Sequence, residues 1–306
     1  MSVDRHRASA GLVVFAALCL LSSWLVAAVW AAFAQSEPPF SVGTRLFAAL
    51  VVYALTMGWQ PLVATWIVRR WIDPIDVVDL GFRPAKSRDS VLAGLAAMLV
   101  VGVASLVALG FVALGWTGAT SAHSPERGVV IDDNVVLFIA STGTVLIGVF
   151  QAMTEEVGWR GYFLHRATQR FGRFRGLVLQ SVLWGVWYAP VIFFASYKHG
   201  GVRGAVVRGA VCVLTSALLG VLLGVLTLAS RSLTPAVIAN TTVTFAAGLP
   251  YVLVGLDAGV RSAVFGPAGW IVLGALVLAL AARCSLFSPR DSSRACALPA
   301  LGQPPG

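Results

Sequence analysis

Two adjacent glutamates interrupt an apolar stretch of this sequence. Of the 13 Asp and Glu residues, only Glu155 and Glu156 fall in a segment whose hydropathy predicts a membrane helix. A carboxylate at the centre of such a helix costs roughly 2.5 to 3.5 kcal/mol on insertion scales, so a pair of them indicates a partner or a task. A buried glutamate of this kind can act as a general base that activates water.

Arg160 offers one of these glutamates a partner. Glu156 and Arg160 are four residues apart and share a helix face, so the arginine can neutralise the carboxylate. Glu155 points about 100° away from that pair and is left free to act. The alternative is structural: the two glutamates mark the end of a membrane span predicted over residues 135–155, near the interface.

Three further polar residues lie in apolar surroundings. Tyr188 shortly precedes Pro190, and Asn240 and Thr244 lie one helical turn apart in "TPAVIANTTVTF". Asn240 is the only asparagine in any predicted span. Tyr188 and Asn240 each have an ordinary explanation. Tyr188 could be a packing aromatic, and Asn240 could hydrogen-bond between helices.

The elements that must position these residues are membrane helices. Hydrophobic residues make up 58% of the 306 residues, charged residues 11%, and the mean hydropathy is +0.84. Spans of about 20 apolar residues without alternation predict helices rather than barrel strands. We therefore predict an all-α polytopic protein with about eight transmembrane helices in a single bundle: 11–34, 46–68, 91–115, 135–155, 177–195, 209–229, 234–255 and 267–283.

The distribution of charge predicts the orientation of the bundle. Most of the 22 Lys and Arg residues fall in loops on one side, so both termini are expected in the cytoplasm. The net charge of +9 indicates attraction to anionic membrane lipids rather than to nucleic acid. The basic start and apolar run at 11–34 are expected to remain as a first helix rather than a cleaved signal, because the run is too long for a signal peptide.

The bundle is expected to form one domain over residues 1–284, followed by a disordered cytoplasmic tail over 285–306. Residues 162–175 alternate apolar and basic positions at helical spacing, which favours an amphipathic helix lying in the cytoplasmic interface; the alternative is a basic loop. The four cysteines lack CxxC spacing, so neither a disulfide framework nor a thiolate zinc site is predicted.

In order and spacing, three motifs resemble those of the CAAX-prenyl-protease and bacteriocin-processing (CPBP, or Abi) family. "EEVGWRGY" resembles the Glu-Glu-x-x-x-Arg motif in the form common among bacterial members, "WGVWYAP" resembles the second motif, and "LTPAVIANTTVT" resembles the third. The resemblance covers residues 135–250. It implies a bacterial inner-membrane endopeptidase that cleaves a peptide or lipid-modified protein near the cytoplasmic face.

The resemblance also implies roles for the site residues. The first glutamate, here Glu155, is a general base that activates water, the first histidine positions that water, and a His/Asn pair stabilises the oxyanion. Tyr188 stands in place of the first histidine, Asn240 in place of the second, and Thr244 in place of the asparagine. Glu156 and Arg160 complete the candidate catalytic set.

These departures leave two functions open, an active hydrolase and a pseudo-protease that binds a membrane or peptide partner without cleaving it. Tyrosine, with a reference pKa of about 10, can donate a hydrogen bond but cannot take a proton at neutral pH. A zinc site needs about three protein ligands, and Glu155, Tyr188 and Asn240 are a poor set, so no cofactor is predicted and a divalent metal is disfavoured. A transporter with an intramembrane proton site is a third possibility, but no inverted repeat is visible.

Overall fold

The computed structural model describes residues 2–33, 54–74, 81, 87–113, 148–254 and 267–283. Within these ranges the chain is helical and contains no β-strand, which confirms the predicted all-α class. The predicted tail over 285–306 and most of the predicted span 135–155 lie outside the described residues.

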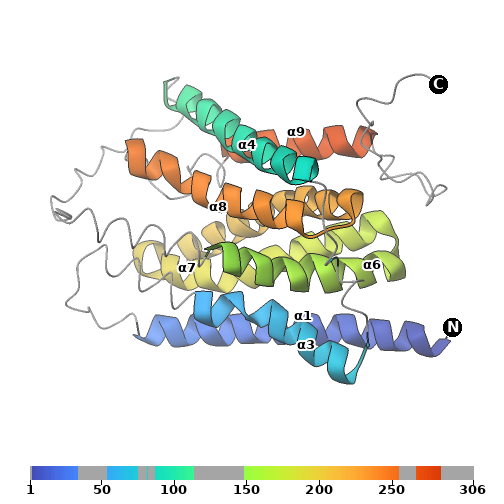
Figure 1. Cartoon of the computed structure of the whole chain (residues 1–306). Helices are drawn as coiled ribbons and strands as arrows, with labels where there is room; N and C mark the ends of the chain where they lie inside the picture. The colour runs from blue at the N-terminus through green and yellow to red at the C-terminus, as the bar shows by residue number, and fades with distance from the viewer. Residues whose placement is uncertain are drawn as a thin grey trace, which may run out of the picture.

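A helix occurs in the described part of every predicted span (Figure 1). Residues 148–156 are also helical, and they continue directly into η3 at Val157. The elements are α1 (Ser2–Phe33), η1 (Ala54–Gly58), α3 (Gln60–Trp71), α4 (Ser87–Ala113), η3 (Val157–Phe163), α6 (Leu164–Phe171), α7 (Arg173–Ser230), α8 (Thr234–Val254) and α9 (Pro267–Arg283), where η1 and η3 are π-helices.

Helix α7 is two predicted spans joined at a kink. Gly201 has φ of 59° and ψ of −164°, a backbone conformation that residues with a side chain rarely adopt. The two halves, Arg173–Phe194 and Gly200–Ser230, are each long and apolar enough to cross a membrane, as is His6–Ala31 of α1. Shorter apolar helices lie at Ser90–Val100 and Gly269–Ala279. The chain is therefore an all-α membrane protein.

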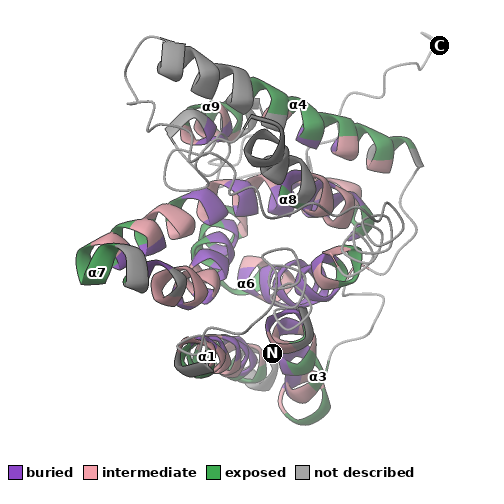
Figure 2. Ribbon diagram, turned by 90° about the vertical axis from the view of Figure 1, so that its left-hand side faces the viewer, coloured by how far each residue is buried: buried purple, intermediate pink, exposed green. Residues whose placement is uncertain are grey.

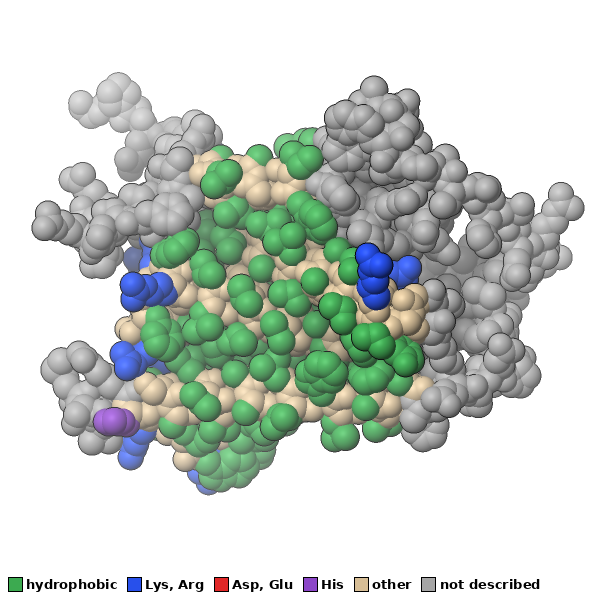
Figure 3. Space-filling model, turned by 180° about the vertical axis from the view of Figure 1, so that it is seen from behind, with side chains coloured by type: hydrophobic (Ala, Val, Ile, Leu, Met, Phe, Trp, Pro, Cys, Tyr) green, Lys and Arg blue, Asp and Glu red, His purple; other side chains and the backbone are tan. Residues whose placement is uncertain are grey.

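The surface fits this conclusion. Large hydrophobic side chains are exposed along α1, α4 and α7, including Leu21, Leu99 and Val202 at 60% or more. Figure 3 shows hydrophobic side chains spread across one face of the molecule, with Lys and Arg side chains at its two ends. A bilayer gives such a face an apolar solvent and leaves the charges in water.

The helices pack around the segment that carries the two glutamates. On one side α1 packs on α7 and α3, and on the other α4 packs on α8 and α9 (Figures 1 and 2). Every residue of η3 is buried. Aromatic rings fill the contact with α1, where the Phe15 ring lies 5.2 Å from Trp159 and 5.5 Å from Phe163.

The predicted amphipathic helix over 162–175 is only partly correct. Helix α6 ends at Phe171, and Gly172, with φ of 82°, turns the chain into α7 at Arg173. Leu164 and Ala167 are fully buried against the protein, while Phe171 remains 43% exposed. The buried face of α6 therefore packs on α7 rather than lying in the interface.

Candidate active site

Close packing on α3 positions the segment that carries the glutamates. Gly158 lies against Pro61 so tightly that a Cβ atom would come within 2.7 Å of the Pro61 carbonyl oxygen. Thr154 secures the same contact, because its hydroxyl donates to the carbonyl of Gly58 at 2.7 Å. The π-helical stretch η3 begins at this contact, and such insertions are frequent at functional sites.

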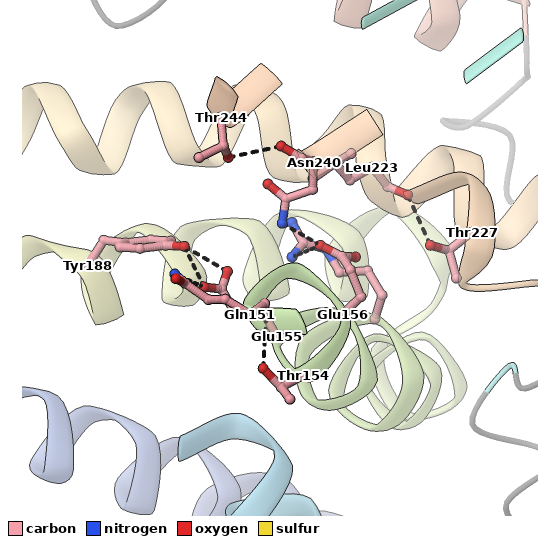
Figure 4. A network of polar contacts seen from close by, with 10 residues as sticks. Gln151, Thr154, Glu155, Glu156, Tyr188, Leu223, Thr227, Asn240 and Thr244 are labelled. Carbon is pink, nitrogen blue, oxygen red and sulfur yellow. Dashed lines mark hydrogen bonds and ion pairs between the residues drawn. The ribbon is translucent and has the colours of Figure 1, made fainter. Parts of the chain in front are cut away.

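Glu155 is enclosed by hydrogen-bond donors. Glu155 is buried, with only 1% of the residue exposed. The hydroxyl of Tyr188 lies 2.8 Å from Oε1 and 2.6 Å from Oε2, and Gln151 donates to Oε1 at 2.8 Å (Figure 4). Tyr188 reaches the carboxylate from α7, one turn from Trp184. The carboxylate is thus held in place by two neutral donors.

Glu156 has a different set of partners. Arg160 donates through Nη1 to Oε1 at 3.0 Å, so the ion pair expected from the four-residue spacing is present. Asn240 of α8 donates to the same oxygen at 3.0 Å (Figure 4). The Arg160 guanidinium also lies 3.9 Å from the centre of the Trp184 ring, a cation–π contact. Both members of the ion pair are completely buried.

The structure therefore brings five of the six candidate residues into one region. Tyr188 contacts Glu155, whereas Asn240 and Arg160 contact Glu156. Thr244 differs, because its hydroxyl donates to the carbonyl of Asn240 in its own helix at 2.9 Å, and the residue is exposed. No hydrogen bond in the described part of the chain joins the Thr244 side chain to either glutamate.

The sequence reading did not single out Gln151 or Gln60. Gln151 precedes Glu155 by four residues on the same helix, so the spacing rule that identified Arg160 could also have found it. Gln60 accepts a hydrogen bond from the Trp187 indole at 2.8 Å and ties α3 to α7 beside Tyr188. No local spacing could have indicated that contact, since the two residues are 127 positions apart.

Asp73 lies in a non-helical stretch just after α3 and is buried, at 3% exposure. Arg166 binds both of its oxygens, at 2.8 and 2.6 Å, and the Tyr162 hydroxyl donates to it at 3.0 Å. These contacts of Asp73, which we call the Asp73 cluster, join the end of α3 to η3 and α6. The Asp73 cluster is separate from the contacts of Glu155 and Glu156.

The site places the oriented carboxylate of Glu155 beside the carboxylate of Glu156, whose charge is balanced by Arg160. Glu155 can accept a proton from water, and the Glu156–Arg160 pair adds no net charge next to it. Among the residues that the structure describes, no three His, Cys, Asp or Glu side chains gather closely enough to hold a metal ion.

Comparison with known proteins supports the family expected from the motifs. The family model described as type II CAAX prenyl endopeptidase Rce1-like matches residues 137–246, which contain both glutamates, Tyr188 and Asn240. CAAX prenyl protease 2 of Methanococcus maripaludis is 37% identical over 49 residues, which are 16% of this chain. That match spans only 18% of the relative's own length. Residues 137–246 are thus similar to the Rce1-like type II CAAX prenyl endopeptidases, which supports the CAAX-type family expected from the motifs.

Proposed function

We propose that this chain is a membrane-embedded endopeptidase that hydrolyses a peptide bond in a lipid-modified CAAX protein or peptide. The observation that carries the proposal is the buried carboxylate of Glu155, oriented by Tyr188 and Gln151 beside a neutralised Glu156. A carboxylate held in this way can take a proton from water as the water attacks the scissile carbonyl. Glu155 is the general base in this proposal.

The neighbouring residues have supporting roles. Tyr188 holds the base in position but supplies no second proton acceptor. Asn240 already donates one amide hydrogen to Glu156, so its second amide hydrogen is the one available to a developing oxyanion. Arg160 holds Glu156 in place through the buried ion pair. Thr244 donates its hydroxyl to the Asn240 carbonyl in its own helix, so it can act only through the position of Asn240.

We further propose that the protein lies in the inner or plasma membrane of a bacterial cell. Both termini are then in the cytoplasm, and cleavage occurs near the cytoplasmic face. The arginines at the ends of α3 and α6 and at the start of α7, including Arg69, Arg170 and Arg173, support this orientation because cytoplasmic loops are enriched in positive charge. The partners are therefore the lipid-modified substrate and the surrounding lipids, and nucleic acid is not among them.

A second function, binding without cleavage, is favoured by one observation. The Tyr188 hydroxyl approaches both oxygens of Glu155, the place where a water molecule would otherwise be activated. Such a pseudo-protease would bind the same lipid-modified peptide and release it intact.

The test is cleavage of a farnesylated CAAX peptide by the purified chain in lipid nanodiscs. The protease proposal expects measurable cleavage that Glu155→Ala removes. The matched control is Trp270→Phe, which removes a hydrogen bond between α9 and α7 at Thr215, away from the glutamates, and is expected to retain the rate. Binding of the peptide without cleavage above the Glu155→Ala background would instead establish the pseudo-protease.

A further inference from the structure

The ion pair between Glu156 and Arg160 uses only part of the hydrogen-bonding capacity of the two side chains. Arg160 donates through Nη1, and Glu156 accepts through Oε1. Among the described residues, Nε and Nη2 of Arg160 and Oε2 of Glu156 have no hydrogen-bond partner, although all three are buried. Buried polar atoms are nearly always paired, so three such atoms on one ion pair indicate a ligand.

The geometry of a guanidinium group narrows the identity of this ligand. Nε and Nη2 form one edge of the planar group, and their N–H bonds point outward side by side. The Trp184 ring covers a face of the guanidinium at 3.9 Å, so the edge is the part left for recognition. The Glu156 Oε2 atom adds an acceptor beside these donors.

Two donors and an acceptor complement a peptide group. A backbone carbonyl can accept from the Arg160 edge while an N–H donates to Glu156 Oε2. Charge also favours this ligand over a carboxylate. The ion pair is neutral overall, and a bound carboxylate would add a buried negative charge close to Glu155 and Glu156.

The position of the pair suits a substrate. Glu156 is adjacent to the proposed base, and Asn240 joins it to α8, which otherwise packs on α4 and α7. Successive Cα atoms of an extended peptide are about 3.8 Å apart, so neighbouring peptide groups of one chain can reach both glutamates. Desolvation at this buried pair would strengthen each hydrogen bond that forms.

We propose that the unpaired edge of the Glu156–Arg160 pair binds a backbone amide of the peptide substrate, next to the bond that Glu155 hydrolyses. This inference rests on the protease function proposed above. It gives Glu156 and Arg160 a binding role in addition to their structural ion pair.

The test uses farnesylated CAAX peptides in which each backbone amide in turn is replaced by an ester, which removes one N–H donor. Affinity is measured in nanodiscs with the full chain carrying Glu155→Ala, so that bound peptide is not consumed. One ester position is expected to weaken binding about tenfold, as for a lost hydrogen bond to a charged group. In the Glu155→Ala, Glu156→Gln protein the same ester should weaken binding less than about twofold, because the glutamine oxygen stays with Arg160 and Asn240 and its NH2 group, a donor, takes the place of the accepting Oε2.

Arg160→Lys provides the second measurement. Lysine keeps the positive charge beside Glu156 but lacks the guanidinium edge, so the amide peptide should bind about tenfold more weakly. Trp270→Phe in the same Glu155→Ala background is the control, and it should retain the full ester effect.

Four outcomes would overturn the inference. If no ester position weakens binding, or if the ester effect is unchanged by Glu156→Gln, the amide is bound elsewhere, while cleavage by the unmodified chain keeps the protease proposal intact. If amidating the peptide's C-terminal carboxylate causes the loss that depends on Arg160, the ligand is that carboxylate. A peptide that is neither bound nor cleaved by the unmodified chain would reject the proposed function together with this inference.

Discussion

Tyr188 donates its hydroxyl to Glu155, with the two carboxylate oxygens 2.8 and 2.6 Å away. This contact orients the carboxylate. A phenol with a reference pKa of about 10, however, remains protonated at neutral pH, whereas histidine titrates near neutrality. The protein therefore retains the orienting contact at this position without a second proton acceptor.

Replacing both Tyr188 and Asn240 with histidine should raise peptide cleavage. The double variant restores the two histidines that the family resemblance expects, at positions that contact Glu155 and Glu156. Individual groups of this kind contribute about 10² to 10³ in rate, so kcat/KM should rise by at least about 10² for the farnesylated peptide. The measurement is steady-state cleavage in nanodiscs.

A matched control lies on the same helix. Tyr197→His makes the same chemical change nine residues after Tyr188 on α7, at a residue that is 49% exposed. It should leave the rate unchanged. A folded Tyr188→His, Asn240→His protein with no gain in cleavage would show that the histidines are not what limits this site.

The local features of the site could be predicted from the sequence, and the non-local ones could not. Spacing along one helix was enough for the Glu156–Arg160 pair, and an unusual buried asparagine was enough to identify Asn240. Thr244 shares a helix face with Asn240, but its hydroxyl bonds the carbonyl four residues earlier, a local competitor that spacing cannot rank.

Asp73 and the π-helix η3 illustrate what the sequence did not predict. Asp73 meets Tyr162 across 89 residues of chain, and no pattern around Asp73 indicates the contact. Gly158 of η3 packs on Pro61, a contact between distant segments that exists only in the folded bundle. The all-α class was easier to predict because composition alone excludes other ways of satisfying the backbone in lipid.

Arg166→Ala should destabilise the protein by about 2 to 4 kcal/mol, because it leaves the buried Asp73 carboxylate without its charged partner. The side chain of Asp73 is 4% exposed and that of Arg166 is 19% exposed, so water can compensate little of the loss. Reversible unfolding in mixed micelles gives the free energy. The exchanged pair Asp73→Arg with Arg166→Asp should recover part of the loss if the ion pair is what matters.

Arg170→Ala is the control for that measurement. Arg170 lies on the same helix but makes an exposed hydrogen bond to Ser9, so its removal should cost less than about 1 kcal/mol. Equal losses from Arg166→Ala and Arg170→Ala would argue against a special role for the Asp73 cluster.

The proposed orientation predicts which positions are labelled from outside intact cells. In a chain whose four cysteines are replaced by alanine, Arg203→Cys should react with an impermeant maleimide from outside, because Arg203 is exposed near the kink of α7. Arg170→Cys, exposed at the opposite end of the bundle, should react only after the membrane is permeabilised. The reverse pattern would place the termini outside the cytoplasm.

Gly158→Ala should destabilise the bundle and disturb the site together. The added Cβ would meet the Cβ, carbonyl carbon and carbonyl oxygen of Pro61, and the oxygen would be only 2.7 Å away, so α3 and η3 must separate. Overpacking of this kind costs about 1 to 3 kcal/mol. Because Glu155 and Glu156 immediately precede this contact, cleavage of the farnesylated peptide should fall as well.

Gly274→Ala makes the same substitution in α9, where no atom of the described residues lies within 4 Å of the added Cβ, the adjoining backbone of its own helix aside. Alanine is the better helix former, so this variant should be as stable as the original chain or more stable. If Gly158→Ala matches Gly274→Ala in both unfolding free energy and peptide cleavage, the close approach of η3 to Pro61 does not position the glutamates. If only Gly158→Ala loses both, the packing contact that begins the π-helix is also what sets the geometry of the carboxylate site.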